Sequence, residues 1–220
     1  MKYLLRVLKS LEKHVRMVSS MSGKQVFDYF VILDFEATCQ ANNQPSLNEI
    51  IEFPALLVDT HSLQIKSQFH SFVRPLIEPE LSSFCYHLTG ITQEIVDESP
   101  SFPFVFESFQ KWLQERQGSQ LAFMTCGNWD LNCCLVDECK RNNITLTEQF
   151  KHWIDIKQSF FQVNGVWPKG LQDMMAKESP TMVGRPHSGR DDCMNLYLLL
   201  CKLVSKGHVF NITNHCHRKE

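Results

Sequence analysis

One apolar run that ends in two acids limits this chain most. Residues Tyr29–Leu33 are all apolar or aromatic and lead directly into Asp34, Phe35 and Glu36. A continuous run of this length predicts a buried strand. Residues i and i+2 of an extended chain face the same side, so the two carboxylates project together. Because neighbouring buried acids repel each other unless a cation compensates them, the pair predicts either a solvated strand end or a site for a hard metal ion.

Further periodic segments favour a mixed α/β sheet. Apolar and alternating runs predict additional strands at Gln64–Val73, Leu121–Cys126, Trp153–Ile156 and Ile50–Val58, the last of these broken by Pro54. Short polar segments connect the three strands that come first along the chain, Tyr29–Leu33, Ile50–Val58 and Gln64–Val73. These short connections indicate antiparallel pairing. Helical spacing predicts helices at Glu80–Leu88, Phe102–Gln117, Asp130–Arg141 and Asp191–Lys206. Strands that begin as a meander and then alternate with helices predict an α/β domain with a mixed central sheet flanked by helices.

Two further acidic positions lie where predicted helices begin. Asp130 follows the strand Leu121–Cys126, and Asp191 and Asp192 follow the loop that carries His187. Their ordinary interpretation is capping, with Asp130 and Asp191 as N-caps. The other interpretation is a two-metal phosphodiester hydrolase, in which four carboxylates gather beside a histidine: Asp34, Glu36, Asp130, Asp192 and His187. Histidine titrates near neutral pH and can accept the proton of an attacking water molecule.

The order of these residues resembles that of the DEDDh 3′→5′ exonucleases, whose fold is similar to ribonuclease H. Five segments narrow the match: Val31–Cys39, Glu49–Pro54, Leu88–Ile91, Thr125–Leu131 and Gly184–Asp192. In these segments the chain resembles the enhanced-RNAi exoribonuclease family, which includes a histone-mRNA 3′ exonuclease and a prion-protein-interacting exonuclease. Together the segments place the resemblance between Gln25 and Thr213, which is nearly the whole body of the chain.

The resemblance implies a role for each matching residue. The metal ligands would be Asp34, Glu36, Asp130 and Asp192, and the catalytic pair would be His187, as general base, with Glu36. The implied cofactors are two Mg²⁺ ions, with Mn²⁺ as a substitute, and the implied partner is RNA with a free 3′ end. The expected reaction releases 5′-nucleoside monophosphates from that end. The expected substrate contacts are Phe35, Ala37, Thr38, Leu88, Thr89, Gly90 and Trp129.

The overall charge leaves two other functions open. A formal net charge of −2 argues against a protein that coats nucleic acid through a basic surface, but not against a nucleic-acid enzyme. A DNA-directed 3′→5′ exonuclease would need the same metal ligands. A catalytically idle RNA-binding or interaction module would show RNA binding without turnover that chelators block.

The charge is divided unevenly along the chain. Residues 1–25 hold six basic residues and one acidic residue, and the remainder holds 16 basic and 23 acidic residues. The segment 1–25 also places Leu4, Leu5, Leu8, Leu11 and Val15 at helical spacing. It therefore predicts a basic amphipathic extension. The resemblance implies that an exonuclease domain follows at 26–213, with a tail at 214–220. The extension is interpreted as an ordered end, a surface or protein-partner helix, or a mitochondrial transit peptide.

Cysteine usage and hydropathy indicate the compartment. The nine cysteines are odd in number, and Cys133 and Cys134 are adjacent. We therefore expect reduced thiols and a cytoplasmic or nuclear location, or a mitochondrial one if the extension acts as a transit peptide. No apolar run reaches the roughly 20 residues of a membrane helix, so we expect no membrane span.

Overall fold

The structure, a computed structural model, describes residues 24–41, 47–116, 118–178 and 182–216. The predicted extension up to residue 23 and residues 217–220 of the predicted tail lie outside these ranges. The strands are β1 (Tyr29–Leu33), β2 (Glu36–Ala37), β3 (Ile50–Asp59), β4 (Ile65–Phe72), β5 (Leu121–Thr125), β6 (His152–Asp155) and β7 (Asn214–His215). The α-helices are α2 (Ser83–Thr89), α3 (Gln93–Asp97), α4 (Phe102–Gln114), α5 (Leu135–Arg141), α6 (Ile156–Asn164), α7 (Leu171–Glu178) and α8 (Gly189–Ser205). A π-helical turn, η2 (Asp130–Cys134), precedes α5, and a 3₁₀ turn, η3 (Glu148–Lys151), precedes β6.

The strands form one mixed sheet, as the sequence predicts. β1 pairs antiparallel with β3 and parallel with β5, and β5 pairs parallel with β6. β4 and β7 add antiparallel strands at the two ends. The predicted meander is confirmed for β1, β3 and β4, while the later strands follow helical connections. The carboxyl ends of β1 and β5 therefore meet at the same edge of the sheet.

The predicted break at Pro54 is wrong, because β3 runs through this proline. β1 pairs with β3 as far as Leu33 opposite Ala55, and β2 resumes the pairing with Glu36 opposite Glu52. Pro54 lies between these pairs, where β1 gives way to β2. Proline has no N–H to donate, so it is tolerated where the ladder is already interrupted. The interruption falls at Asp34 and releases its backbone from the sheet.

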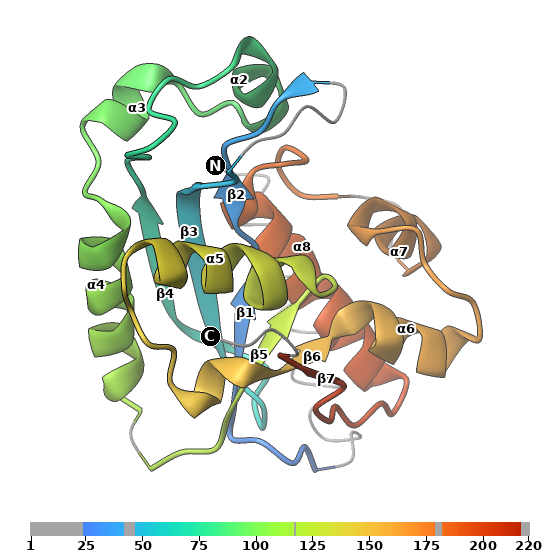
Figure 1. The fold of residues 1–220 in the computed structure, drawn as a ribbon. Coiled ribbons are helices and arrows are strands. Elements are labelled where there is room, and N and C mark those ends of the chain that lie inside the picture. Colours follow the sequence, from blue (N-terminus) through green and yellow to red (C-terminus); the bar gives the residue numbers. More distant parts are fainter. Residues whose placement is uncertain (1–23, 42–46, 117, 179–181, 217–220) are drawn as a thin grey trace.

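Helices cover both faces of the sheet, with α5 on one face and α8 on the other (Figure 1). Alternate residues of β1 enter the two cores. Val31 and Leu33 pack with α4 and α5, whereas Phe30 and Ile32 pack with α6, α7 and α8. Because both faces of this strand are buried, its register is fixed, and the residues that follow it start from a rigid position.

The helix starts differ from the predicted ones at the two acidic positions. α8 begins at Gly189 with Ser188 as its N-cap, so Asp191 is not the cap. Its carboxylate instead accepts the N–H of Arg185 at 2.9 Å. Asp130 is not a cap either, because it lies inside the first turn of η2. In both places the aspartate lies inside the helical segment, because that segment begins before the residue that would follow an aspartate cap.

Other helix boundaries have local causes. The helix predicted from Glu80 begins at Ser83, because the hydroxyl of Ser82 accepts the N–H of Cys85 at 3.0 Å and caps it. The helix predicted to reach Gln117 ends at Gln114. Three helices, α3, α6 and α7, were not predicted from the sequence. For α6 the signals are present, since Asp155 caps its start and Gly165 ends it in the left-handed conformation.

All nine cysteines lie in the described part of the chain and are free, in agreement with the expected reduced thiols. Within the same ranges, no helix combines the length and the apolar character that crossing a membrane requires.

Candidate functional site

A cleft of about 330 Å³ opens at the carboxyl ends of β1 and β5. In sheets of this kind, ligands commonly bind outside the carboxyl ends of parallel strands. The residues that line the cleft are Asp34, Phe35, Glu36, Ala37, Cys39, Asn48, Leu88, Cys126, Trp129, Asp130, Leu171, His187 and Asp192. The four predicted metal ligands and the predicted general base therefore share one cleft.

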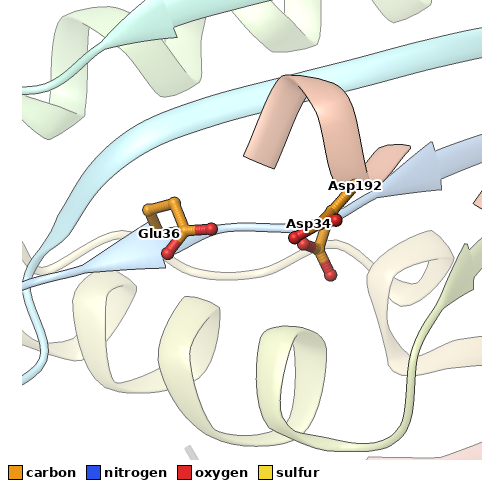
Figure 2. Close-up of side chains that lie close together, drawn as sticks. All are labelled: Asp34, Glu36 and Asp192. Carbon is orange, nitrogen blue, oxygen red and sulfur yellow. The ribbon is translucent and has the colours of Figure 1, made fainter. Parts of the chain in front are cut away.

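Three of the carboxylates lie together in Figure 2. Asp34 follows β1, Glu36 belongs to β2, and Asp192 comes from the first turn of α8. One oxygen from each lies within 4.8 Å of the others. The short separation of Asp34 and Glu36 follows from their i and i+2 positions, but Asp192 arrives from the opposite end of the domain sequence.

The fourth carboxylate reaches the group through the backbone of Phe35. The N–H of Phe35 donates to Oδ1 of Asp130 at 2.9 Å. Asp130 opens the π-helical turn after β5, where its carbonyl accepts the N–H of Leu135. Single π-helical turns occur frequently at functional sites. The hydrogen bond fixes Asp130 beside the segment that carries Asp34.

Burial and mutual repulsion make the charged forms of these acids costly. Burial, followed by repulsion from Asp130 and Asp192, holds the pKa of Asp34 well above its ordinary value. Burial, followed by repulsion from Glu52, raises the pKa of Glu36 to about 8. Burial also raises the pKa of Asp130 to about 6 and raises that of Asp192. In the part of the chain that the structure describes, no lysine or arginine forms an ion pair with any of the four.

The donor set fits a divalent cation. Oδ2 of Asp192 accepts the N–H of His187 at 2.9 Å, whereas Oδ1 is buried and has no hydrogen-bond partner among the described residues. A buried oxygen of this kind needs a hydrogen-bond donor or a bound ion. Carboxylate oxygens are the ligands that hard ions such as Mg²⁺ and Mn²⁺ prefer. The negative charge of the group and the chemistry of its oxygen atoms therefore both fit a divalent cation.

His187 is held at the cleft by its backbone. Its φ angle is +61°, which is uncommon for a residue other than glycine. The hydrogen bond from its N–H to Asp192 ties this conformation to one of the acids. The side chain is exposed and lines the cleft. The imidazole is thus accessible to water beside the carboxylates.

The residues that hold α8 against the sheet were not predicted from the sequence. Glu52 of β3 accepts the N–H of Gly189 at 2.9 Å and lies 2.8 Å from Nε2 of His70. A Cβ atom at Gly189 would lie 2.4 Å from the carbonyl oxygen of Asp34, so only glycine permits this approach. Glu52 and Gly189 therefore set the distance between Asp192 and the end of β1. The available signal was a glutamate inside an apolar run.

Four of the seven predicted substrate contacts line the cleft: Phe35, Ala37, Leu88 and Trp129. The other three have structural partners. The hydroxyl of Thr38 accepts the N–H of Glu49 at 3.0 Å, and that of Thr89 donates to the Cys85 carbonyl at 2.9 Å. Gly90 has a φ angle of +76°, which strains any residue other than glycine, and it lies against the guanidinium of Arg185. Contact of these three with a substrate stays a prediction. Residues of the lining that sequence reasoning did not identify are Cys39, Asn48, Cys126 and Leu171.

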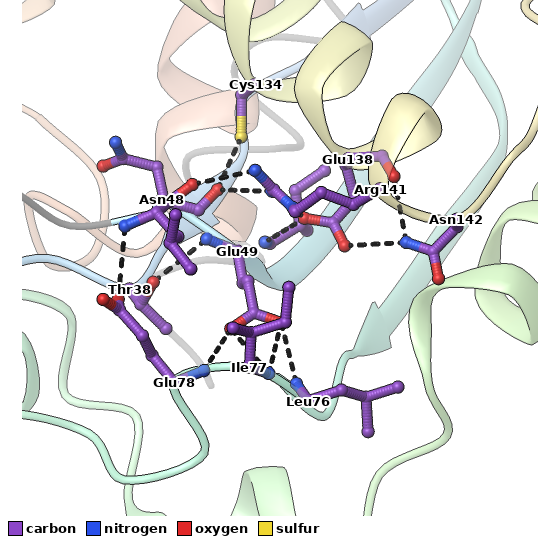
Figure 3. Close-up of polar contacts among 12 residues, drawn as sticks. Thr38, Asn48, Glu49, Leu76, Ile77, Glu78, Cys134, Glu138, Arg141 and Asn142 are labelled. Atoms are coloured by element: carbon purple, nitrogen blue, oxygen red, sulfur yellow. Dashed lines mark hydrogen bonds and ion pairs between the residues drawn. The ribbon is translucent and has the colours of Figure 1, made fainter.

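A second group of buried carboxylates supports the cleft wall at Asn48 (Figure 3). Glu49 accepts backbone N–H groups from three consecutive residues, at 2.7 to 3.1 Å: Leu76, Ile77 and Glu78. Glu138 pairs with Arg141 at 2.6 Å and accepts the N–H of Ile50 at 3.2 Å. Arg141 also donates to the carbonyl of Asn48 at 3.4 Å. We call Glu49 and Glu138 the wall carboxylates, and Asp34, Glu36, Asp130 and Asp192 the cleft carboxylates.

Comparisons with known proteins agree with this geometry. A family model described as "Exonuclease" matches residues 31–200. The human protein "ERI1 exoribonuclease 3" is 39% identical over 197 residues, which cover 86% of this chain; the chain spans 58% of that relative. The nuclease domain of 3′hExo, described as a DEDDh family member bound to rAMP, superposes with a TM-score of 0.84 at 34% identity, covering 88% of this chain and 100% of that one. A 3′-exonuclease described in 3′-end recognition of a histone mRNA stem-loop gives a TM-score of 0.85 at 34% identity, covering 88% and 89%.

Proposed function

This chain belongs to the exonuclease family, and we propose that it hydrolyses RNA from the 3′ end, releases 5′-nucleoside monophosphates and depends on divalent ions. The observation that carries the proposal is the group of cleft carboxylates beside His187. Among the described residues, no lysine or arginine forms an ion pair with these carboxylates. The names of the similar proteins, which are exoribonucleases, support RNA as the substrate.

The cleft carboxylates would hold two ions, Mg²⁺ or Mn²⁺. Glu36 and Asp192 would bind one ion, Asp130 would bind the other, and Asp34 would contact both. When bound, the ions supply positive charge that stabilises the charge developing on the phosphate. The same charge compensates the repulsion that raises the pKa values of these acids.

His187 and the cleft walls would perform the remaining steps. The exposed imidazole of His187 would accept the proton of the attacking water molecule. Asp192 keeps His187 in place through the backbone hydrogen bond. Trp129, with 41% of its surface exposed, offers a ring face to the terminal base from one wall, and Leu88 forms part of the cleft lining as well.

Hydrolysis of labelled RNA tests the proposal. Wild-type protein should release 5′-monophosphates from the 3′ end in Mg²⁺ or Mn²⁺ and stop when EDTA is added. His187→Ala should lower the rate by about 10²- to 10⁴-fold, the usual contribution of general base catalysis. His61→Ala is the control, because His61 is an exposed histidine in the turn between β3 and β4.

Three outcomes would contradict the proposal. Equal rates for His187→Ala and wild type would remove the base role. Faster hydrolysis of a matched DNA would identify a DNA exonuclease. RNA binding without EDTA-sensitive turnover would identify an idle binding module.

A further inference from the structure

The cleft has room for little more than the 3′-terminal nucleotide of an RNA chain. Its volume of about 330 Å³ is at the low end of the range for small-molecule pockets, roughly 300–1,000 Å³. The nucleotides upstream of the terminal one must therefore cross a rim of the cleft. Leu88 of α2 belongs to one rim and Leu171 of α7 to another. Figure 1 shows α2 and α3 well separated from α6 and α7.

The two rims differ in charge. The segment 78–98, which contains α2 and α3, has five acidic residues and no lysine or arginine of its own, and Arg185 lies against it, donating to the carbonyls of His87 and Leu88. The segment 156–178, which contains α6 and α7, has three lysines, one aspartate and one glutamate, and Lys177 forms an ion pair with Asp173. The second rim is therefore the less acidic of the two, and an RNA chain, which is a polyanion, is repelled less by it than by the first.

The second rim carries an exposed apolar surface made of Phe161, Val166 and Trp167, which we call the platform. Their exposed fractions are 45%, 52% and 54%. The rings of Phe161 and Trp167 meet edge to face, with centroids 5.9 Å apart. Large apolar side chains that gather on a surface commonly mark a binding site, because exposing them to water is unfavourable. The platform has the ring faces that nucleic-acid bases stack on.

The platform is fixed by the loop that carries it. Gly165 ends α6 with a φ angle of +71°, and its N–H donates to the carbonyl of Phe161 at 2.8 Å. Pro168 is buried directly after Trp167. The N–H of Lys169 donates to the carboxylate of Asp173 in α7 at 3.0 Å. The outward position of Trp167 is therefore set by anchors on both sides.

Lys157 joins the platform to the cleft. Its ammonium lies 5.6 Å from the centre of the Trp167 ring. Its Cδ atom is 4.0 Å from where a Cβ atom of Gly127 would stand, between the cleft residues Cys126 and Trp129. A positive charge thus lies between the mouth of the cleft and the aromatic surface, at the place where a backbone phosphate would cross.

We propose that the platform binds the RNA bases upstream of the terminal nucleotide, with Trp167 and Phe161 stacking on bases and Lys157 contacting the phosphate between platform and cleft. The inference rests on the proposed exoribonuclease function and adds the path of the strand. Base stacking tolerates any sequence. The enzyme should therefore prefer longer single strands over very short ones without requiring a particular base.

Substrate length separates the platform from the cleft. Trp167→Ala should lower kcat/KM on a twelve-nucleotide RNA by roughly 5- to 50-fold, the range expected from losing one stacked base. On a dinucleotide, which reaches only the cleft, the same variant should equal wild type. Trp167→Phe should recover most of the loss. Phe104→Ala is the control, since Phe104 is 67% exposed on α4.

Binding gives a second measurement that does not need hydrolysis. In EDTA, fluorescence anisotropy with the labelled twelve-nucleotide RNA should show weaker binding by Trp167→Ala. Lys157→Gln should reduce the slope of log affinity against log salt by about 0.7, the loss of one phosphate contact to a single strand. Equal binding by Trp167→Ala and wild type would overturn the inference, whether or not the protein hydrolyses RNA. Equal losses on both substrate lengths would also overturn it, and a protein partner would then be the occupant to seek.

Discussion

The cleft carboxylates, of which Asp34 is half-buried and the rest buried, and the buried wall carboxylates lie at one end of the sheet, yet they differ in their partners. Glu49 receives three backbone N–H groups and Glu138 pairs with Arg141 (Figure 3). The cleft carboxylates have two backbone hydrogen bonds between them, from Phe35 and His187, and no cation among the described residues. Burial alone does not separate the groups, because it also raises the pKa of Glu138, which Arg141 opposes. Each wall carboxylate has either a cation or several N–H donors, whereas in the described part of the chain the cleft carboxylates have no cation and two backbone N–H donors among the four, which is the arrangement that metal ions would complete.

Removing the central cleft acid should have the largest effect. Asp34→Asn should lower hydrolysis of RNA by about a thousandfold or more, because the ions it holds supply several kcal/mol of charge stabilisation. The same change should raise the melting temperature in EDTA, since it removes repulsion with Asp130 and Asp192. Melting curves and rates with and without Mg²⁺ measure both effects.

The paired result distinguishes this acid from a structural one. Asp97→Asn on the exposed face of α3 is the control and should change neither quantity by much. An Asp34→Asn protein with more than about a tenth of wild-type activity would contradict the assignment. A lower melting temperature in EDTA would place Asp34 with the compensated acids of the wall.

Breaking the wall pair should change stability rather than metal response. Arg141→Met leaves Glu138 buried without its cation, which typically costs about 3–5 kcal/mol. Lys111→Met, which breaks an exposed ion pair with Glu107 on α4, should cost less than about 1 kcal/mol. Urea unfolding measures both. If Mg²⁺ restored the stability of Arg141→Met, the wall would share the metal site and the distinction between the groups would fail.

Sequence patterns were sufficient for the cleft acids and insufficient for what positions them. The i and i+2 spacing brings Asp34 and Glu36 together without any knowledge of the fold, and the order of motifs adds Asp130, Asp192 and His187. Glu52 and His70 are 18 residues apart and meet only because β3 and β4 pair in one register. Helix α8 was expected to start at a good capping residue, but the approach of Gly189 to the carbonyl of Asp34 decides the start. Contacts that depend on strand register, or on two backbone segments meeting, join residues far apart in the sequence. They therefore leave only weak signals in any one segment.

Glu52 tests whether the positioning of α8 matters for the cleft. Removing its carboxylate in Glu52→Ala frees the N–H of Gly189 and the ring of His70. Loss of a residue that orients metal ligands typically lowers metal affinity or activity by about 10- to 100-fold. We expect a lower kcat and a higher Mg²⁺ concentration at half-maximal rate.

A conservative replacement separates positioning from folding. Glu52→Gln retains an oxygen for Gly189 and an N–H₂ group for His70, so it should recover most of the activity. If Glu52→Ala lowered only the melting temperature and left kcat and the Mg²⁺ requirement unchanged, Glu52 would belong with the wall carboxylates as a purely structural acid.

The pH dependence of stability gives the smallest and most direct contrast. Glu36 shifts from an ordinary pKa of 4.5 to about 8 in the folded protein, and Asp130 shifts upward to about 6. At a pH between the ordinary pKa and the folded pKa of each acid, the folded state binds more protons than the unfolded state. Stability in EDTA should therefore fall as pH rises from about 4.5 to 8. The fall should be on the order of 10 °C in melting temperature for a chain of this size.

Added Mg²⁺ and the variant Glu36→Gln test whether the cleft carboxylates cause this fall in melting temperature. Mg²⁺ binds the ionised acids, so it should raise the melting temperature strongly at pH 8 and little at pH 5. Glu36→Gln cannot ionise and should flatten the curve measured in EDTA, whereas Glu138 keeps its cation and should contribute a slope that Mg²⁺ does not alter. A wild-type curve in EDTA that rises steadily to pH 8 would mean that the cleft carboxylates are already compensated within the protein. The contrast with the wall would then disappear, because both groups would carry their charge without an added ion.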